Sequence, residues 1–484
     1  MAKQIEQNQT ENQAIENKSK LRTRIIISTI SSILVAFAAL VLIRVNNFSD
    51  KKDAPSLSHL QEVQLYTYLQ ETYPQRYEIL HKLSYIDNYP SLDVGAGSAI
   101  LIDVRTGDIL YEKNADEIIP PASMTKLFAM YVVDQEVAAG RLSYNQIIPI
   151  PEEALACNMP PHSSLMFLGE GQVVTLEELL LGLSICSGND AAYALAYTVS
   201  GSMEAFIERM NQIAFDLKLK NTHFVESSGY SELNTTTARE MAAFCKVYLS
   251  EHPDSLKKFH AVRNFTYPKE ENMAPGDKYG PQDFSQGLPR HITMGITQSN
   301  TNPLLGKLKG CDGLKTGYID ESGYNLALTA IRNDTRFLSV TMRGPGRSTA
   351  EGQAGRIKDG TTLMNYAFGS FADLTHISAV KNYFVKNYGS KEMGFYAVPA
   401  YNVEGVCVPY LTGDSIADNM NNVQIEVNVP EKFTEPVKAG EKVGEIKIIL
   451  GNNVLETVPL IADRTTTKCN GLMSLIDKVA VKFN

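Results

Sequence analysis

The chain has 484 residues, 45 of them basic and 54 acidic, which gives a formal net charge of −9. This length exceeds one ordinary hydrophobic core and predicts two or three domains. The acidic balance and the lack of a long basic run argue against a nucleic acid partner. The cysteines are scattered without the close pairs of zinc sites, so we expect no metal site and assign no disulfide.

The first predicted element is a membrane-spanning helix at residues 25–43. The stretch carries no charge and is long enough to cross about 30 Å of hydrocarbon. A cleaved signal peptide is the alternative, but its length and the polar segment 1–24 before it favour an uncleaved anchor with a cytoplasmic tail. The basic residues favour, by a small margin, an N-terminus in the cytoplasm and the rest of the chain on the extracytoplasmic or periplasmic side of the cell membrane: Lys18, Lys20, Arg22 and Arg24 before the stretch, against Arg44, Lys51 and Lys52 after it.

Residues 44–90 are predicted to form a stalk or helical linker. Leucine, tyrosine and charged residues follow one another with helical spacing from about Leu57 to Leu83, and Asn88-Tyr89-Pro90 then breaks the helix. We expect this segment to connect the membrane to the domain that follows.

The pattern Ser-x-x-Lys marks a candidate nucleophile with its base. The pattern occurs four times, so it decides nothing alone: Ser49, Ser123, Ser255 and Ser378. At Ser123 it follows two prolines and opens an apolar run that predicts a long helix. Because residues three apart share a helix face, a neutral Lys126 amine could take the proton of the Ser123 hydroxyl.

Two later patterns add polar groups beside apolar elements. Ser187-Gly188-Asn189-Asp190 follows the apolar run 179–185, and Lys315-Thr316-Gly317 precedes a predicted strand at 324–331. Gly317 would let a bound peptide lie close to that strand. Each pattern alone fits an ordinary turn or strand end. Together, Ser-x-x-Lys, Ser-x-Asn and Lys-Thr-Gly in this order indicate a penicillin-binding protein or a serine β-lactamase.

The sequence resembles the low-molecular-mass penicillin-binding proteins, the serine-type D-alanyl-D-alanine carboxypeptidases. The resemblance implies an α+β, β-lactamase/transpeptidase-like catalytic domain at 91–375, with an antiparallel sheet that includes the 99–111 hairpin and the 325–340 strands. It extends over several segments: Ala99–Asp103, Thr106–Tyr111, Pro120–Leu127, Asn221–Phe224, Asp312–Gly317 and Ser322–Asn325.

The resemblance also implies a reaction. Ser123 would attack a peptidoglycan stem peptide that ends in D-Ala-D-Ala, with Lys126 as its base, and water would then hydrolyse the acyl-enzyme. β-Lactam antibiotics would act as covalent inhibitors, and no metal or organic cofactor is required. Ser187 and Asn189 would relay a proton and hold the substrate amide, while Lys315 would sustain the electrostatics of the site.

Substrate binding is expected from the segment around Gly317. By resemblance, Thr316 and Arg356 would receive the terminal carboxylate, because a guanidinium fork suits a carboxylate. The backbone N–H groups of Ser123 and Tyr318 would form the oxyanion hole. Some relatives have histidine at Tyr318, and relatives often have an Asn-x-x-Gly-Leu pattern where this chain has a different loop ending in Ser228-Gly229-Tyr230.

The rear of the chain, residues 376–466, is predicted to be a small all-β domain. Alternating stretches at 423–427 and 446–450 read as strands, with Gly451-Asn452-Asn453 as a turn. The resemblance implies a β-sandwich-like module that holds the catalytic domain off the membrane or contacts partners. The tail 467–484 has one apolar face, so it is either a membrane-lying amphipathic helix, as in relatives, or a last packed element of the β-domain.

Two other functions remain open at this stage. A serine β-lactamase shares the fold and the acylation step, but often needs an extra glutamate to position water, and neither Glu170 nor Glu178 stands in a segment that resembles that loop. A non-catalytic penicillin-binding or scaffold protein would bind without turnover, which the intact Ser123, Lys126 and Lys315 argue against.

Overall fold

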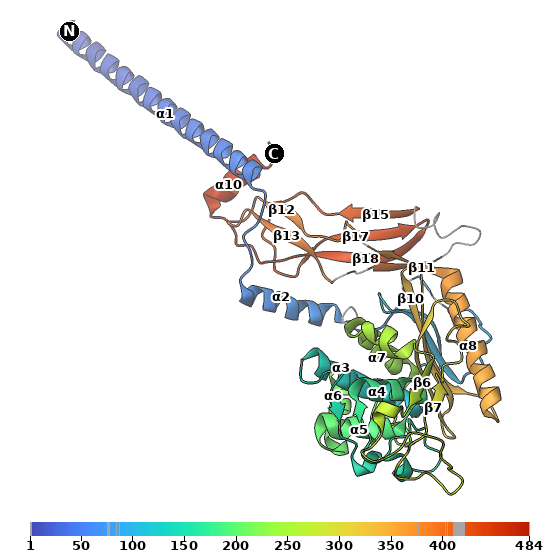
Figure 1. The fold of residues 1–484 in the computed structure, drawn as a ribbon. Helices are drawn as coiled ribbons and strands as arrows, with labels where there is room; N and C mark the ends of the chain where they lie inside the picture. Colours follow the sequence, from blue (N-terminus) through green and yellow to red (C-terminus); the bar gives the residue numbers. More distant parts are fainter. Residues whose placement is uncertain are drawn as a thin grey trace.

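The computed structural model describes residues 2–74, 78–83, 85–86, 88–375, 377–401, 403, 405–409 and 422–483. A long N-terminal helix projects from a β-domain, and a domain of mixed helices and strands lies on the far side of that β-domain (Figure 1). The architecture is therefore α+β with a separate β-domain, as the sequence predicted.

Helix α1 (Ala2–Asp50) forms the projecting rod. Its part Asn12–Asp50 is long and apolar enough to cross a membrane, and contains the predicted stretch 25–43. The helix continues to Asp50, so the segment predicted to be a stalk begins as an extension of α1.

Helix α2 (His59–Thr72) begins at a capping box, in which the Ser58 hydroxyl accepts from Gln61 N and the Gln61 side chain accepts from Ser58 N. The prediction of helical structure up to Leu83 is wrong in its second half. The helix stops at Thr72 because Pro74 disfavours helical geometry at the residue before it. Strand β1 (His81–Lys82) follows instead and pairs with β3.

The mixed domain is built on one sheet with the strand order β1-β3-β2-β10-β9-β8. It joins the N-terminal hairpin to the three strands of the later segment, as predicted: β2 (Ser98–Asp103), β3 (Asp108–Lys113), β8 (Cys311–Ile319), β9 (Gly323–Arg332) and β10 (Thr335–Gly344). β8 forms one edge of this sheet and β1 the other in the described part of the chain.

Both faces of this sheet are covered, and side chains of β10 alternate between them. Leu338, Val340 and Met342 join the core beneath the helices α3 (Lys126–Ala138), α4 (Leu176–Leu181), α5 (Asn189–Ser200), α6 (Met203–Asp216) and α7 (Ala238–Glu251). Phe337 points to the opposite face, where α8 (Thr349–Ser370) supplies Leu363 and Met364.

Short elements complete the mixed domain between its helices. They are two strand pairs and several single-turn helices: β4 (Ile147–Ile148) with β5 (Val174–Thr175), β6 (Asn264–Tyr267) with β7 (Ile296–Ser299), η2 (Ala122–Thr125), η3 (Glu152–Ala154), η4 (Ala156–Asn158), η5 (Gly182–Cys186), η6 (Leu256–His260) and η7 (Glu270–Asn272).

The C-terminal part contains a six-stranded sheet and a separate two-stranded ribbon, as an all-β domain requires. The sheet has the order β15-β17-β18-β13-β12-β16, and the ribbon pairs β11 with β14. The strands are β11 (Phe371–Thr375), β12 (Tyr383–Asn387), β13 (Gly394–Pro399), β14 (Gly405–Pro409), β15 (Val423–Asn428), β16 (Lys432–Phe433), β17 (Lys442–Leu450) and β18 (Asn453–Ala462). The predicted turn at 451–453 joins β17 to β18.

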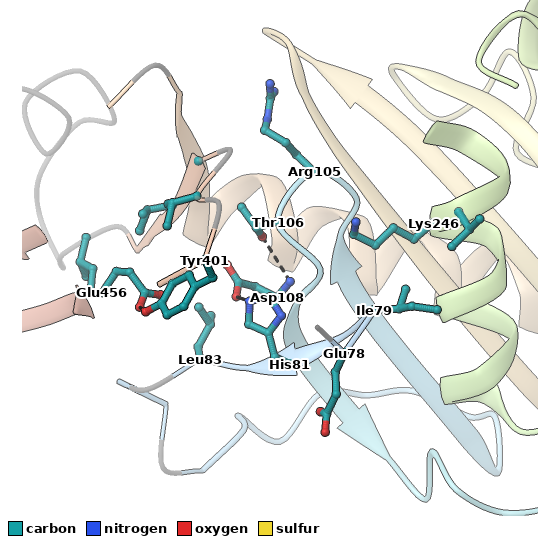
Figure 2. Close-up of a pocket in the computed structure, with 15 residues that line it drawn as sticks. Glu78, Ile79, His81, Leu83, Arg105, Thr106, Asp108, Lys246, Tyr401 and Glu456 are labelled. Atoms are coloured by element: carbon teal, nitrogen blue, oxygen red, sulfur yellow. Dashed lines mark hydrogen bonds and ion pairs between the residues drawn. The ribbon is translucent and has the colours of Figure 1, made fainter. Parts of the chain in front are cut away.

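A cavity of about 290 Å³ lies where the mixed domain meets the ribbon and the C-terminal sheet (Figure 2). Beside it, His81 Nε2 lies 2.9 Å from Asp108 Oδ1. Arg105 donates to Asp373 of the ribbon at 3.0 Å, and the Tyr85 hydroxyl donates to the Cys407 carbonyl. The last two of these contacts fix the ribbon against the mixed domain.

The last helix, α10 (Gly471–Ala480), packs against the end of α1. Arg44 forms a buried two-point ion pair with Asp477, at 2.6 and 3.1 Å, and Phe48 stacks on Tyr388 of the β-domain. Ile476 is buried in this cluster, whereas Leu472, Leu475 and Phe483 are exposed. α10 therefore has one packed face, and exposed apolar side chains lie on the helix and just beyond its end.

Candidate active site

Ser123 lies in η2, the single turn that leads into α3. Asn325 of β9 donates to the carbonyls of Pro120 and Pro121, at 3.1 and 3.3 Å, which fixes this segment to the sheet. Gly317 of β8 passes so close that a Cβ there would lie 2.5 Å from the Pro121 carbonyl oxygen. Glycine at this position therefore brings the edge strand against the nucleophile segment.

Lys126, the first residue of α3, is fully buried and directs its amine at Ser123. Its Nζ lies 3.1 Å from Ser123 Oγ and donates to Asn189 Oδ1 at 2.8 Å and to the Ser228 carbonyl at 2.6 Å. Burial lowers the pKa of Lys126 to about 7, against the opposing charges of Glu226 and Asp190. A neutral amine within hydrogen-bond reach of a hydroxyl can accept its proton.

Lys315 is a second buried amine, carried by β8. Its Nζ donates to Ser187 Oγ and to the Thr316 carbonyl, both at 3.0 Å. Burial, followed by the positive charges of Lys126 and Arg356, holds the pKa of Lys315 well below its ordinary value. Ser187 has a left-handed backbone with φ +59 at the end of η5, which directs its hydroxyl toward this lysine.

Asp190, which sequence reasoning did not single out, fixes the Ser-x-Asn segment. Its buried carboxylate accepts hydrogen bonds from the backbone N–H groups of Met166, Phe167, Leu168 and Ala191. Burial raises the pKa of Asp190, although these four bonds oppose the shift. The start of α5, including Asn189, is thereby tied to the loop at 166–168.

The remaining predicted residues lie along β8, β9 and α8. Thr316 is buried and donates to Thr301 Oγ1 at 2.7 Å. Arg356 donates through Nε to the Asn325 carbonyl and through Nη2 to the Gly317 carbonyl, so two of its nitrogens bind strand backbone. Tyr318 is half exposed, and its hydroxyl donates to Asp320 at 2.6 Å.

An open cleft of about 550 Å³ lies over the nucleophile. Ser123, Asn189 and Tyr318 all line it, so the two proposed oxyanion-hole residues face one space. Lys126 and Lys315 lie beneath this surface, at 0% and 1% exposure. A carbonyl bound in the cleft would therefore meet the Ser123 hydroxyl while both amines stay shielded from water.

The loop after α6 supplies two further residues that the motifs did not indicate. Gly229 has φ +79, and a Cβ there would lie 1.8 Å from the Ala122 carbonyl oxygen, so only glycine fits against the nucleophile turn. Glu226 accepts hydrogen bonds from the N–H groups of Ser228 and Gly229. The departure of the Ser228-Gly229-Tyr230 segment from the family pattern could have marked this loop, but it indicated no role for Glu226.

Among the described residues, one group has the donor atoms for a metal ion: Asp103, Asp373 and Cys407, at the domain junction. None of the three lines the cleft. Burial and the adjacent Asp373 raise the pKa of Asp103 well above its ordinary value, which favours a proton between the two carboxyl groups.

The chain matches two family models. Residues 86–346 match the D-alanyl-D-alanine carboxypeptidase family, peptidase S11, and residues 398–468 match the C-terminal domain of penicillin-binding protein 5. These two matches correspond to the mixed domain and to the C-terminal part of the fold.

Individual relatives agree with the family models. The chain is 30% identical to D-alanyl-D-alanine carboxypeptidase DacC of Escherichia coli over 82% of this chain and 90% of the relative. It is 28% identical to DacF of Bacillus subtilis over 77% and 86%. The structure of penicillin-binding protein 5 from Haemophilus influenzae superposes with a TM-score of 0.63 at 25% identity, over 79% of this chain and 100% of that one. The chain belongs to the D-alanyl-D-alanine carboxypeptidase family of serine peptidases.

Proposed function

We propose that the chain removes the terminal D-alanine from peptidoglycan stem peptides through an acyl-enzyme on Ser123. The observation that carries the proposal is the 3.1 Å contact between Ser123 Oγ and Nζ of Lys126, a buried lysine with a pKa of about 7. The neutral amine takes the hydroxyl proton as Oγ attacks the penultimate D-alanine carbonyl. The C–N bond then breaks, and the departing D-alanine nitrogen receives a proton.

The Ser187–Lys315 pair is suited to that second proton transfer. Lys315 and Lys126 are bonded to the two polar residues of the Ser-x-Asn turn, Ser187 and Asn189 respectively. Two ammonium groups repel each other in a site shielded from water. The state in which only one of the two lysine amines is protonated is therefore favoured over the state in which both are. The Ser187 hydroxyl relays that proton to the leaving nitrogen, and the Asn189 amide holds the substrate amide.

The binding of the substrate carboxylate is assigned to the Thr316 hydroxyl and to Arg356. With Nε and Nη2 of Arg356 bonded to strand carbonyls, the guanidinium acts through its charge and through Nη1, which donates to no protein group in the described ranges. The N–H groups of Ser123 and Tyr318 receive the oxyanion. Water then hydrolyses the ester, with no cofactor in any step.

The β-lactamase alternative is less well supported. Glu178 caps α4 by accepting from Thr175, and Glu170 is exposed and pairs with Arg290, so neither carboxylate lines the cleft. The acidic residues that line the cleft are Glu232, Asp320 and Glu321, and the last two follow the Lys-Thr-Gly motif in the chain. We therefore propose that β-lactams are covalent inhibitors whose acyl-enzymes on Ser123 are hydrolysed slowly.

A retained membrane anchor is part of the proposal. The buried Arg44–Asp477 pair and the Phe48–Tyr388 stack involve residues just after the apolar stretch of α1. Cleavage beyond Phe48 would leave Asp477 buried without its partner. These contacts support a single-pass anchor with the β-domain and the catalytic domain outside the cytoplasm, and Leu472, Leu475 and Phe483 then face the membrane surface.

The test uses the full chain in detergent. Labelled penicillin should form a covalent adduct that Ser123→Ala abolishes, and a D-Ala-D-Ala pentapeptide should release D-alanine. An adduct of equal yield in Ser123→Ala would overturn the serine assignment. Fast hydrolysis of penicillin without D-alanine release from the pentapeptide would instead favour a β-lactamase. A penicillin adduct with turnover of neither penicillin nor the pentapeptide would favour a non-catalytic binding protein.

A further inference from the structure

Glu226 makes an unusually complete set of hydrogen bonds for a surface-loop carboxylate. Oε2 accepts from the N–H and the hydroxyl of Ser228, both at 2.6 Å, and Oε1 accepts from Gly229 N at 2.6 Å and from Asn234 Nδ2 at 2.8 Å. All four donors point at an acceptor, and an ionised carboxylate is acceptor-only. The loop is therefore built around the charged form of Glu226.

The segment that Glu226 organises touches the catalytic base directly. The carbonyl of Ser228 accepts from Lys126 Nζ at 2.6 Å, the shortest of the three bonds of that amine. The next residue, Gly229, lies against the Ala122 carbonyl and lines the cleft. Because the carboxylate holds the N–H groups of both residues, it fixes the direction of the carbonyl between them.

The charge of Glu226 also acts on the amine. The charged groups that face Lys126 are Glu226 from this loop, Asp190 from α5 and Lys315 from β8; the other groups around the amine are the neutral Ser123 and Asn189. The two carboxylates favour the protonated form of the Lys126 amine, whereas burial disfavours it. Of the carboxylates, Glu226 has the larger effect.

Resting on the proposed function, in which Lys126 is the base of Ser123, we propose that Glu226 is a positioning residue for that base. Its carboxylate holds the Ser228 carbonyl against the amine and places a fixed negative charge behind it. Without that charge, the Lys126 amine would be a weaker base. Its ammonium form would lose a proton more easily, and the neutral amine would take the Ser123 proton less readily.

The test is the pH profile of penicillin acylation in the full chain in detergent. Glu226→Gln removes the charge, so the midpoint of the acid limb should shift to lower pH by roughly 0.5 to 1 unit. Its plateau rate should fall about 3- to 10-fold, because the carbonyl of Ser228 is held less firmly. Glu226→Asp keeps the charge, so its plateau should fall while the midpoint stays in place.

Two further variants separate this role from a structural one. Glu240 is a similar half-buried acceptor, bonded to Asn221 N and the Thr222 hydroxyl, and it has no part in the lysine contacts, so Glu240→Gln should leave the midpoint unchanged. Glu226→Asn also removes the charge but has a shorter side chain, and it should lower the midpoint as well, even if Glu226→Gln folds poorly.

The outcomes distinguish the two proposals. If the midpoint stays in place in Glu226→Gln and Glu226→Asn, or moves equally in Glu226→Asp, the positioning role is wrong while acylation of Ser123 stands. If the parent chain forms no Ser123-dependent adduct, the proposed function itself has failed.

Discussion

The cleft and the membrane-proximal junction both bury cationic side chains, but they do so in opposite ways. In the cleft, neither Lys126 nor Lys315 forms an ion pair with a described carboxylate, and both amines are bonded to hydroxyl, amide and carbonyl oxygens. At the junction, Arg44 makes a two-point pair with Asp477, whose side chain is 2% exposed.

The difference corresponds to the role of each cation, proton transfer in the cleft and structural pairing at the junction. A buried amine without an adjoining carboxylate is driven toward its neutral form, which is the form that can accept a proton. A buried guanidinium stays charged and needs its partner, so the pair holds α1 to α10 instead of reacting. Loss of one partner should therefore abolish activity in the cleft and stability at the junction.

The largest effect is expected for Lys126→Met, which removes the amine and keeps most of the side-chain volume. Acylation by labelled penicillin should fall by roughly 10²- to 10⁴-fold, since the Ser123 hydroxyl loses its base. Thermal unfolding should shift less than in a variant that leaves a buried charge unpaired, because Lys126→Met removes the donor from two neutral acceptors, Asn189 Oδ1 and the Ser228 carbonyl. Lys113 also donates to two backbone carbonyls, at 2.9 and 2.8 Å, outside the cleft, so Lys113→Met is a matched control that should acylate normally.

The junction should respond in the reverse way. Arg44→Met leaves Asp477 buried without its cation and should lower the local unfolding free energy by roughly 3–5 kcal/mol. Hydrogen exchange of the α10 amides in detergent measures this loss. The double variant Arg44→Met with Asp477→Leu should recover much of it, and Ser123 should acylate at the parental rate in both. Normal protection of α10 in Arg44→Met would contradict the assigned role of the pair.

The pH dependence of acylation sharpens the contrast further. The reactive form of Lys126 is the neutral one, and its pKa is about 7, so the acylation rate should fall about tenfold per unit as the pH drops below 7. Above pH 7 the amine is already neutral, and the rate should level off. A rate that is flat from pH 5 to 9 would exclude Lys126 as the titrating base.

The residues of the proposed active site could be singled out from sequence because each sits in a short local pattern. Ser-x-x-Lys, Ser-x-Asn and Lys-Thr-Gly, taken together in this order and beside apolar elements, indicate Ser123, Asn189 and Lys315. In the structure Ser123 and Asn189 line one cleft, and Lys315 is buried beneath it. The strands of the main sheet were predictable for the same reason, since their apolar residues alternate or run continuously over six to ten positions.

The contacts that were missed join residues with no local pattern. Arg44 and Asp477 lie 433 positions apart, so nothing in either segment indicates the other. Glu226 acts through backbone N–H groups of its own loop, which any sequence could offer. The prediction of a helix up to Leu83 was wrong because the helical spacing of the sequence continues past Pro74, whereas the steric effect of Pro74 on the residue before it ends the helix.

The smallest effect is expected where an ion pair is exposed. Lys358 of α8 lies 2.8 Å from Asp93, with side-chain exposures of 52% and 84%. Water already solvates both groups, so Lys358→Ala should leave the thermal midpoint and the acylation rate unchanged. This variant removes the same kind of contact as Arg44→Met but without burial. If it destabilised the chain as strongly, pairing rather than burial would be the cause of the junction's stability, and the contrast with the unpaired lysines of the cleft would lose its basis.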